Sequence, residues 1–290
     1  MLFKNRKTLF IHLYRLFALL KKHLPNLLLA LFSTLLCLVV AEIGLRVVMG
    51  KHLALVTSER SLAYKYDETL GWFPIPNSSK VYNLTTSITL NHNSRGFRDI
   101  EHVTDEKPGI LFLGDSFTWG YDVEAEERFS DKLRDSLADW NIYNLGISGY
   151  GTDQQLLLLK EQYDYYNPKI VFIVFCYDND RLDNSMNIRY SNYYKPYYTI
   201  KNKELSIQGT PVPKSESHYF SEHPLLSRSY IIRLVIRSYF RQTNPELVLN
   251  EDPTHALYTE IKKFTDSKGA ELMVGFQKRD QLLEQHLDSL

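Results

Sequence analysis

The stretch GILFLGDSFTWG, at residues 109–120, decides how this chain is expected to fold. It begins with a short apolar run of the kind that forms a buried strand, and the glycine and aspartate after the run mark a turn. Two later stretches repeat this arrangement: NIYNLGISGYG at 141–151 and IVFIVFCYDND at 170–180. Each apolar run is therefore predicted to be a strand with a polar motif directly beyond its end.

Helical periodicity fills the intervals between the predicted strands. Thr152 or Asp153 is placed to cap the second helix, and Gly269 is a natural end for the third. This alternation predicts an α/β protein with three layers, α/β/α, around a mainly parallel sheet. The predicted helices occupy 124–137, 152–166 and 254–267, and the predicted strands occupy 109–113, 141–145, 170–176 and 271–276.

Two stretches depart from this alternation. Residues 50–108 have no regular period and carry several turn signals, so they are interpreted as a linker and lead-in to a domain at 109–290. The stretch at about 181–250 is too long for a simple connection between strands and is interpreted as an insertion. It is expected to contain a Tyr-rich loop packed over the core, a hairpin of 197–200 with 204–207, and a helix at 225–242.

The N-terminal segment is strongly apolar. Residues 27–41 read LLLALFSTLLCLVVA, and the run continues to Met49 with interruptions at Glu42 and Arg46. That length suits a helix that crosses a bilayer, which takes about 20 mainly apolar residues. Six basic residues precede it, so the positive-inside tendency places the N-terminus in the cytoplasm and exports the remainder.

We therefore expect a single-pass protein of the cell membrane. A basic amphipathic leader at 1–25 would lie on the cytoplasmic side, a transmembrane anchor would span 26–49, and the domain would be extracytoplasmic. A cleaved signal peptide has the same basic-then-apolar layout and is the alternative, although no convincing small-residue cleavage site is present.

Charge and cysteine content argue against several classes of function. The 34 basic and 34 acidic residues balance, whereas a nucleic-acid binder needs a basic excess. Cys37 and Cys176 lie in different regions and form no obvious disulfide or metal-ligand pair. Asp178, Asp180 and Asp183 lack the companion ligands of a metal site. We expect no metal, no other cofactor and no nucleic-acid partner.

The polar motifs carry the candidate chemistry. Ligands of an open parallel sheet bind outside the carboxyl ends of its strands, so Ser116, Gly149 and Asn179 are expected to converge there. A serine hydroxyl at such a turn can attack an acyl carbon when a base accepts its proton. The backbone N–H of Ser116, that of Gly149 and the side-chain amide of Asn179 would then form an oxyanion hole.

These motifs resemble those of the SGNH (GDSL-like) hydrolase superfamily. The resemblance covers roughly residues 91–276 and implies a flavodoxin-like SGNH hydrolase fold with ester hydrolase activity. It implies that Ser116 is the nucleophile and that Gly149 and Asn179 belong to the oxyanion hole. Tyr177 stands where the family usually has glycine. The segment NSRGFRD at 93–99 resembles the lead-in of membrane-anchored members.

The family's fourth motif, Asp-x-x-His after the last strand, has no good match. Asp252 and His255 have the spacing, but they precede the fourth strand, and Asp252 followed by Pro253 is typical of a helix start. His286 has no aspartate at the right spacing and is expected to face solvent on a helix at 280–290. The other exported histidines are expected at the surface: His52, His92, His102, His218 and His223.

The family sheet usually has five parallel strands, and four are predicted here. We therefore expect a truncated product that lacks the C-terminal strand and the histidine loop. The predicted function is a membrane-anchored, extracytoplasmic serine esterase acting on acyl esters, with envelope glycans or lipids as candidate substrates. An inactive SGNH-like binding domain and an O-acyltransferase using the same serine are the alternatives. Without a base, Ser116 is expected to be a poor nucleophile.

Overall fold

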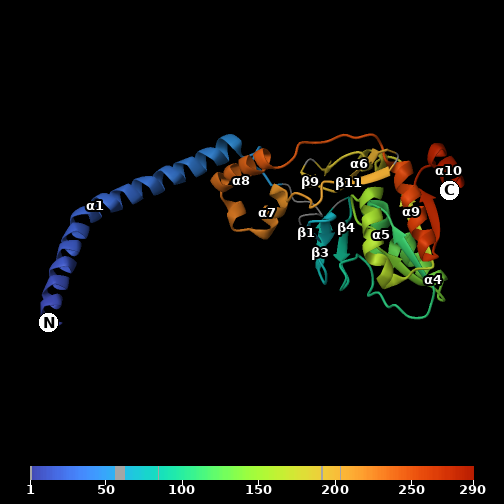
Figure 1. Cartoon of the computed structure of the whole chain (residues 1–290), viewed down its shortest axis with the longest axis horizontal. Coiled ribbons are helices and arrows are strands. Elements are labelled where there is room, and N and C mark those ends of the chain that lie inside the picture. Colours follow the sequence, from blue (N-terminus) through green and yellow to red (C-terminus); the bar gives the residue numbers. More distant parts are fainter. Residues whose placement is uncertain (1, 56–62, 84, 191, 203) are drawn as a thin grey trace. The chain divides into compact units, whose positions relative to one another are not determined.

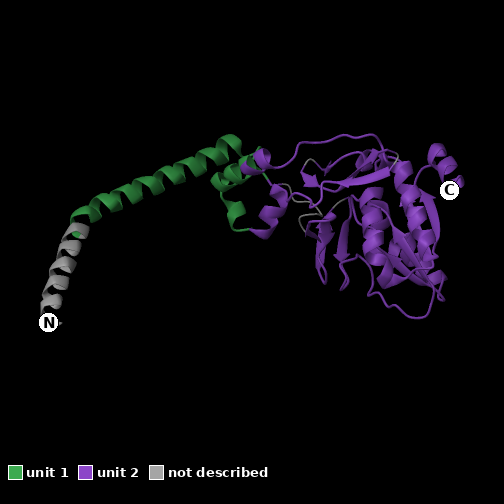
Figure 2. Ribbon diagram, in the orientation of Figure 1, with its two compact units in different colours: residues 1–54, 224–238 green, residues 55–223, 239–290 purple. Residues whose placement is uncertain are grey.

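The computed structural model describes residues 2–55, 63–83, 85–190, 192–202 and 204–290, with side chains from residue 21 onward. The chain divides into two compact units (Figure 2). One unit contains Met1–Ala54 and Pro224–Ser238, and the other contains Leu55–His223 and Tyr239–Leu290.

A four-stranded parallel sheet forms the centre of the second unit (Figure 1). Its strand order is β12-β7-β5-β6, so the chain starts the sheet in the middle and extends it on both sides. The α/β class is confirmed, and all four predicted strands are present with boundaries that match to within one residue. The strands are β5 (Gly109–Leu113), β6 (Asn141–Asn144), β7 (Ile170–Phe175) and β12 (Glu271–Phe276).

Helices cover the two faces of this sheet unequally. α5 (Thr152–Tyr166) and α9 (Thr254–Lys268) pack together on one face, and α10 (Gln281–Asp288) packs on α9. On the other face, η1 (Ala125–Glu127) leads into the short α4 (Phe129–Ser136), which packs beside β6. Right-handed crossovers account for this, because the chain moves one way along the sheet through α4 and the opposite way through α5 and α9. The three predicted layers are present, with α4 as a thin one.

The same asymmetry divides the apolar core. Side chains of β7 that face α5 and α9 are buried, whereas the alternate ones on the α4 face are partly exposed. The buried set is Val171, Ile173 and Phe175, and the partly exposed set is Ile170, Phe172 and Val174. Parallel sheets are normally covered on both faces, so an apolar face left open over β7 and β12 is unusual.

Two hairpins precede the parallel sheet, where the sequence predicts irregular chain. β1 (Tyr64–Asp67) pairs with β2 (Gly71–Pro74), and β3 (Ser79–Asn83) pairs with β4 (Ser87–Asn91). The prediction is wrong because strands of four or five residues are too short to show a clear alternation. This region packs into the main core through Leu70, Trp72, Ile88, Leu90 and Phe97.

The insertion contains the predicted hairpin, formed by β10 (Tyr197–Lys201) and β11 (Glu204–Gln208). The single helix predicted at 225–242 is wrong, because η2 (Leu226–Arg228) and α8 (Tyr230–Thr243) are separated by Ser229 in an extended conformation. Tyr193 and Tyr198 are buried in the core, as expected of a Tyr-rich loop packed over it. The other short elements are α6 (Asp180–Asn184), β8 (Ile188–Arg189), β9 (Tyr193–Tyr194) and α7 (Glu216–Glu222).

The predicted helix caps have different outcomes. Gly269 ends α9 in the left-handed conformation, with a φ of 71°, as predicted. The N-cap of α5 is Gly151 rather than Thr152 or Asp153, and the Gly151 N–H donates to the side chain of Gln154. That prediction is wrong because the Asp153 side chain is buried against a lysine instead of capping the helix.

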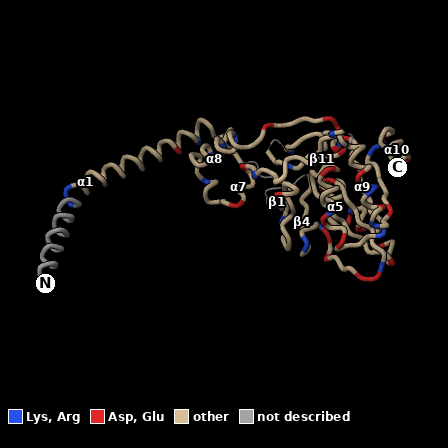
Figure 3. Tube along the Cα trace, viewed as in Figure 1, with Lys and Arg blue, Asp and Glu red and all other residues tan. Residues whose placement is uncertain are grey.

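α1 (Leu2–Met49) forms most of the first unit. Within the described part of the chain, it is the one helix long and apolar enough to cross a membrane, over Lys21–Met49. Figure 3 shows that charged residues lie only towards the two ends of this stretch. The apolar helix is therefore confirmed, while its insertion into a membrane stays a prediction because a signal sequence has the same composition.

Three histidines that were expected at the surface are buried. His92 and His218 are 6% and 4% exposed, and the His102 side chain is 1% exposed. Burial lowers the pKa of both His92 and His218 to about 4. The expectation failed because these rings fill space between segments that are distant in sequence. His52 and His223 are exposed, as expected.

We expect the second unit to lose stability as the pH falls from about 7 to about 4.5, in part through His218. Its folded-state pKa is about 4 rather than 6.5, so in this window the unfolded chain binds a proton that the folded chain excludes. His218→Gln should remove about 2 kcal/mol of that loss. His223→Gln, at an exposed position directly after α7, should leave the loss unchanged. Urea unfolding at the two pH values measures the difference, and an equal pH dependence in both variants would contradict the assignment.

Candidate active site

Ser116 lies at the carboxyl end of β5 as the first residue of α3 (Ser116–Trp119). Gly114 makes the sharp turn from strand to helix possible, because a Cβ there would collide with the Thr118 side chain. Ser116 is half-buried, and the next side chain, Phe117, is exposed. The turn thus places the serine at the edge of the sheet where a nucleophile is expected.

A buried carboxylate beside the serine organises this turn. Asp115 is the N-cap of α3, and its Oδ1 accepts a 2.9 Å hydrogen bond from the Phe117 N–H. Its Oδ2 accepts a 3.0 Å hydrogen bond from the side-chain amide of Asn179. Burial raises the pKa of the Asp115 carboxyl, and these two hydrogen bonds oppose the rise. Asp115 therefore fixes both the start of α3 and the position of Asn179.

Asn179 lies in the loop after β7, directly before α6. Its amide nitrogen has two hydrogens, and because one goes to Asp115, the other is available to an oxyanion. The neighbouring Asp180 accepts a 2.8 Å hydrogen bond from the Cys176 N–H. Burial raises the pKa of Asp180 well above its usual value, which favours a neutral carboxyl at this position. The surroundings of Asn179 therefore suit a neutral hydrogen-bond donor.

The loop after β6 is tied to the same turn. The Asn144 amide donates to the Thr118 carbonyl at 2.7 Å, and the Asn144 Oδ1 accepts from the Gly146 N–H at 2.9 Å. A Cβ at Gly146 would lie 2.6 Å from the Trp119 nitrogen, so only glycine allows this close approach. Gly149, further along the loop, has a φ of 83°, in the left-handed region that favours glycine.

These contacts bring the three motif loops together at the carboxyl edge of the sheet. Asn144 joins the second loop to the first, and Asn179 joins the third loop to the first. The roles of Ser116 as nucleophile, and of Gly149 and Asn179 as oxyanion-hole donors, stay predictions.

The structure contains a buried ion pair next to the second and third loops, and the sequence did not predict it. Lys195, from the insertion, donates to the Asp153 carboxylate of α5, and both side chains are fully buried. The Lys195 ammonium also donates to three backbone carbonyls, which satisfies its charge. Arg189 pairs with Asp183 at 2.5 Å, and burial raises the pKa of Asp183 to about 7 although Arg189 opposes the rise. The polar run TDQQ at the start of α5 is buried, but its residues show no periodicity from which the sequence could predict this burial.

The structure favours the helix-start interpretation of Asp252. Its Oδ1 accepts a 2.9 Å hydrogen bond from the Thr254 N–H, and its Oδ2 pairs with Arg181 at 2.7 Å. The N-cap position itself falls one residue later than predicted. The ring of His255 contacts Arg181 and stacks on His286. Among the residues that the structure describes, Asp252 is therefore not the hydrogen-bonded carboxylate partner of His255.

His286 does not face solvent as predicted. It is half-buried between α10 and α9, and its Nε2 lies 2.9 Å from both the Thr259 hydroxyl and the His255 carbonyl. The rings of His255 and His286 are 4.8 Å apart and nearly parallel, at 9°. This stacking follows from the packing of α10 back onto α9, which the local sequence does not show.

Asp99 and His102 also have the Asp-x-x-His spacing, and this pair was not identified from the sequence. The His102 Nε2 lies 2.8 Å from Asp99 Oδ2, and the His102 Nδ1 lies 2.7 Å from the Tyr166 hydroxyl. Asp99 also pairs with Arg134 at 2.8 Å. Although burial opposes the shift, the hydrogen bond from His102 lowers the pKa of Asp99. With both ring nitrogens engaged and its side chain buried, His102 stabilises the fold rather than serving as a base.

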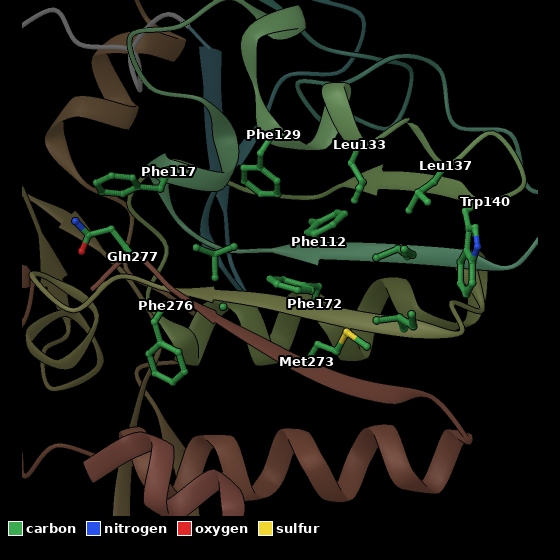
Figure 4. Close-up of a pocket in the computed structure, with 14 residues that line it drawn as sticks. Phe112, Phe117, Phe129, Leu133, Leu137, Trp140, Phe172, Met273, Phe276 and Gln277 are labelled. Carbon is green, nitrogen blue, oxygen red and sulfur yellow. The ribbon is translucent and has the colours of Figure 1, made fainter. Parts of the chain in front are cut away.

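An apolar groove of about 790 Å³ opens on the α4 face of the sheet (Figure 4). It extends from Phe117, one residue after Ser116, to Trp140. Side chains of α4 line one side of the groove, and Phe172 and Met273 line the other. This groove is the uncovered part of the sheet over β7 and β12.

Asp115→Ala removes the cap of α3 and leaves the Asn179 amide without its acceptor. We expect the free energy of unfolding to fall by about 2–4 kcal/mol, because losing a cap costs about 1 kcal/mol and leaving the partly buried amide without an acceptor about 1–3 kcal/mol. Asp178→Ala, at an exposed position in the same loop as Asn179, should change it by less than about 0.5 kcal/mol. Urea titration of both variants measures this. A loss at position 115 no larger than that at 178 would show that Asp115 does not hold the site together.

No family model matches the chain, and no curated protein matches it. Among solved structures, the chain is similar to AlinE4, an SGNH-hydrolase family esterase, with 17% identity and a TM-score of 0.26, over 59% of this chain and 77% of that one. It is also similar to a member of the lipolytic protein G-D-S-L family from Veillonella parvula DSM 2008, with 14% identity and a TM-score of 0.24, over 63% of this chain and 84% of that one. Likenesses at these scores carry no argument about function, which must be inferred from the chain's own site.

Proposed function

We propose that the protein is a membrane-anchored serine ester hydrolase of the SGNH type that acts outside the cytoplasm. The observation that carries the proposal is the hydrogen bond between Asp115 and Asn179, which holds an amide donor next to the serine turn. In this proposal Ser116 is the nucleophile. The Ser116 N–H, the Gly149 N–H and the Asn179 amide form the oxyanion hole.

The proposed reaction passes through an acyl-enzyme. The Ser116 oxygen attacks the ester carbonyl while a base removes its proton, and the carbonyl oxygen becomes an oxyanion held by the three donors. Collapse of this intermediate breaks the ester C–O bond, and the departing alcohol takes the proton from the base. Water then attacks the acyl group in the same way, which releases the acid and restores the serine.

The base is the part of this mechanism that the described residues do not supply. We infer that a histidine in a longer form of the protein accepts the Ser116 proton, from a loop after a fifth strand. Two features of the sheet support such a strand. β12 lies at an edge of the sheet, and α10 packs on α9, on the face that a right-handed crossover to a further parallel strand would use.

The proposed site of action follows from the N-terminal segment. Basic residues precede the apolar stretch of α1, so an inserted α1 would hold the domain on the extracytoplasmic side. Acyl esters of envelope glycans or lipids are therefore the proposed substrates.

Ester hydrolysis should depend on Ser116 and Asn179 in a form of the protein that extends past Leu290. We expect Ser116→Ala to lower kcat for p-nitrophenyl acetate by about 10⁴-fold or more. Asn179→Ala should lower it by about 10²–10³-fold, because one oxyanion donor is lost. Ser136→Ala, at an exposed serine of α4, is the matched control. Equal rates in Ser116→Ala and this control would exclude Ser116 as the nucleophile.

The chain that ends at Leu290 should be a much slower esterase than the extended form. A general base contributes about 10²–10⁴-fold, so we expect a rate difference of that size towards p-nitrophenyl acetate. If the two forms hydrolyse the ester equally fast, the base lies within the 290 residues and the proposed extension is not needed for catalysis.

The missing base also favours a second candidate, a non-catalytic SGNH-like domain that binds an envelope polymer. This candidate predicts that the extended form shows no hydrolysis that depends on Ser116. An O-acyltransferase would instead move the acyl group to a sugar hydroxyl, and this transfer would disappear in Ser116→Ala.

A further inference from the structure

A carboxylate of α1 caps a helix that lies far away in the sequence. Glu42 Oε1 accepts a 2.8 Å hydrogen bond from the Tyr230 N–H, and Oε2 accepts from the Ile231 N–H at 3.1 Å and the Ser229 hydroxyl at 2.9 Å. The first N–H groups of a helix have no partner within that helix. Glu42 therefore caps the N-terminus of α8 together with the Ser229 hydroxyl, which accepts from the Ile232 N–H at 3.3 Å, and its negative charge is favourable there.

Three arginines add hydrogen bonds between residues 42–53, at the end of α1 and just past it, and residues 224–238. Arg46 forms an ion pair with Glu42 at 2.9 Å and donates to a backbone carbonyl of η2 at 2.7 Å. Arg233 and Arg237 of α8 donate to the carbonyls of Leu53 and His52, just past the end of α1. Residues 224–238 are thus held to the last turns of α1 and form one unit with it (Figure 2).

The position of Glu42 along α1 matches the edge of a membrane. Lys22, the last basic residue before the apolar stretch, and Glu42 are 20 residues apart, which is about 30 Å of helix. That is about the thickness of the hydrocarbon core of a bilayer. An inserted α1 would therefore place Glu42 at the outer boundary. A carboxylate there is costly unless it is paired, and α8 and Arg46 supply its partners.

Apolar side chains are exposed around this polar contact. In residues 224–238, Leu225 is 73% exposed and Val235 is 59% exposed. On α1, Val47 and Val48, which follow Arg46, are 79% and 78% exposed. Exposed Leu and Val side chains beside arginines are typical of segments that lie in the headgroup region of a membrane.

We propose that residues 224–238 form a lipid-binding surface in the headgroup region of a phospholipid bilayer, held there by the clamp of Glu42 and Arg46. This inference rests on the membrane anchor in the proposed function. Lipid is the occupant because the surface is continuous with the apolar stretch of α1 that the bilayer would surround. The insertion of the domain is thereby attached to the membrane through a second segment besides the anchor.

The test uses the full chain in vesicles of phosphatidylcholine and phosphatidylglycerol, with Cys37→Ser and Cys176→Ala to remove the native thiols. A fluorophore is attached through Val235→Cys or, as the control, through Leu282→Cys, an apolar position of α10 that is 67% exposed. Lipids brominated near the headgroup should quench the label at 235 at least about twofold more than the label at 282. Equal quenching at the two positions overturns the proposal.

Glu42→Ala tests the clamp itself. It should reduce quenching at position 235 to the level at 282. Ser33→Ala should leave the quenching at position 235 unchanged, because the Ser33 hydroxyl donates to carbonyls of its own helix. Unchanged quenching in Glu42→Ala overturns the clamp. If that variant fails to fold, the comparison of positions 235 and 282 with Glu42 intact still decides the lipid contact.

Carbonate extraction separates failure of this inference from failure of the anchor. A chain that carbonate removes from the vesicles has no membrane-spanning α1, which overturns both. A chain that stays in the vesicles with equal quenching at the two positions overturns the lipid-binding surface and leaves the anchor standing.

Discussion

The hydrogen bond between the buried Asp115 carboxylate and the Asn179 amide is the contact on which the candidate site depends. The other oxygen of the same carboxylate caps α3, which begins at Ser116. Because one planar group serves both partners, α3 and the loop after β7 cannot shift independently. The hydroxyl-bearing turn at Ser116 and the Asn179 amide are thereby held in fixed positions, and electrostatic stabilisation of a transition state requires groups that are preorganised in this way.

The parallel sheet imposes a second constraint, because its strands are apolar on both faces and both faces need a cover. α5 and α9 bury the β7 side chains on one face. On the other face, α4 leaves the groove at Phe172 and Met273 open, and β12 lies at the neighbouring edge of the sheet. The open groove begins at Phe117, directly after Ser116, so the uncovered apolar surface lies next to the candidate site.

Charged side chains in both units are paired with groups that lie far away in the sequence. Lys195 and Asp153 are buried together, and the lysine is further satisfied by backbone carbonyls. Glu42, in the apolar helix α1, is satisfied by Arg46 and by the first N–H groups of α8. In both places one partner belongs to the insertion: Lys195 in the first, and the N-terminus of α8 in the second. Leaving the buried Lys195 or Asp153 without its partner would cost several kcal/mol, which is a large part of the stability of a small domain.

Local periodicity was enough to predict the four parallel strands, the helices α5 and α9, the β10–β11 hairpin and the apolar α1, because each element records its surroundings in neighbouring residues. The order of the motifs also predicted that Ser116, Gly149 and Asn179 follow strands of one sheet. Only the tertiary structure decided that His102 and His218 are buried and that Lys195 pairs with Asp153. It alone also decided that the helix predicted at 225–242 is interrupted at Ser229. Glu42, whose side chain caps α8 directly after Ser229, is 187 residues from Ser229 in the sequence. Partners so far apart leave no local pattern, because the packing of whole elements sets the distance between their side chains.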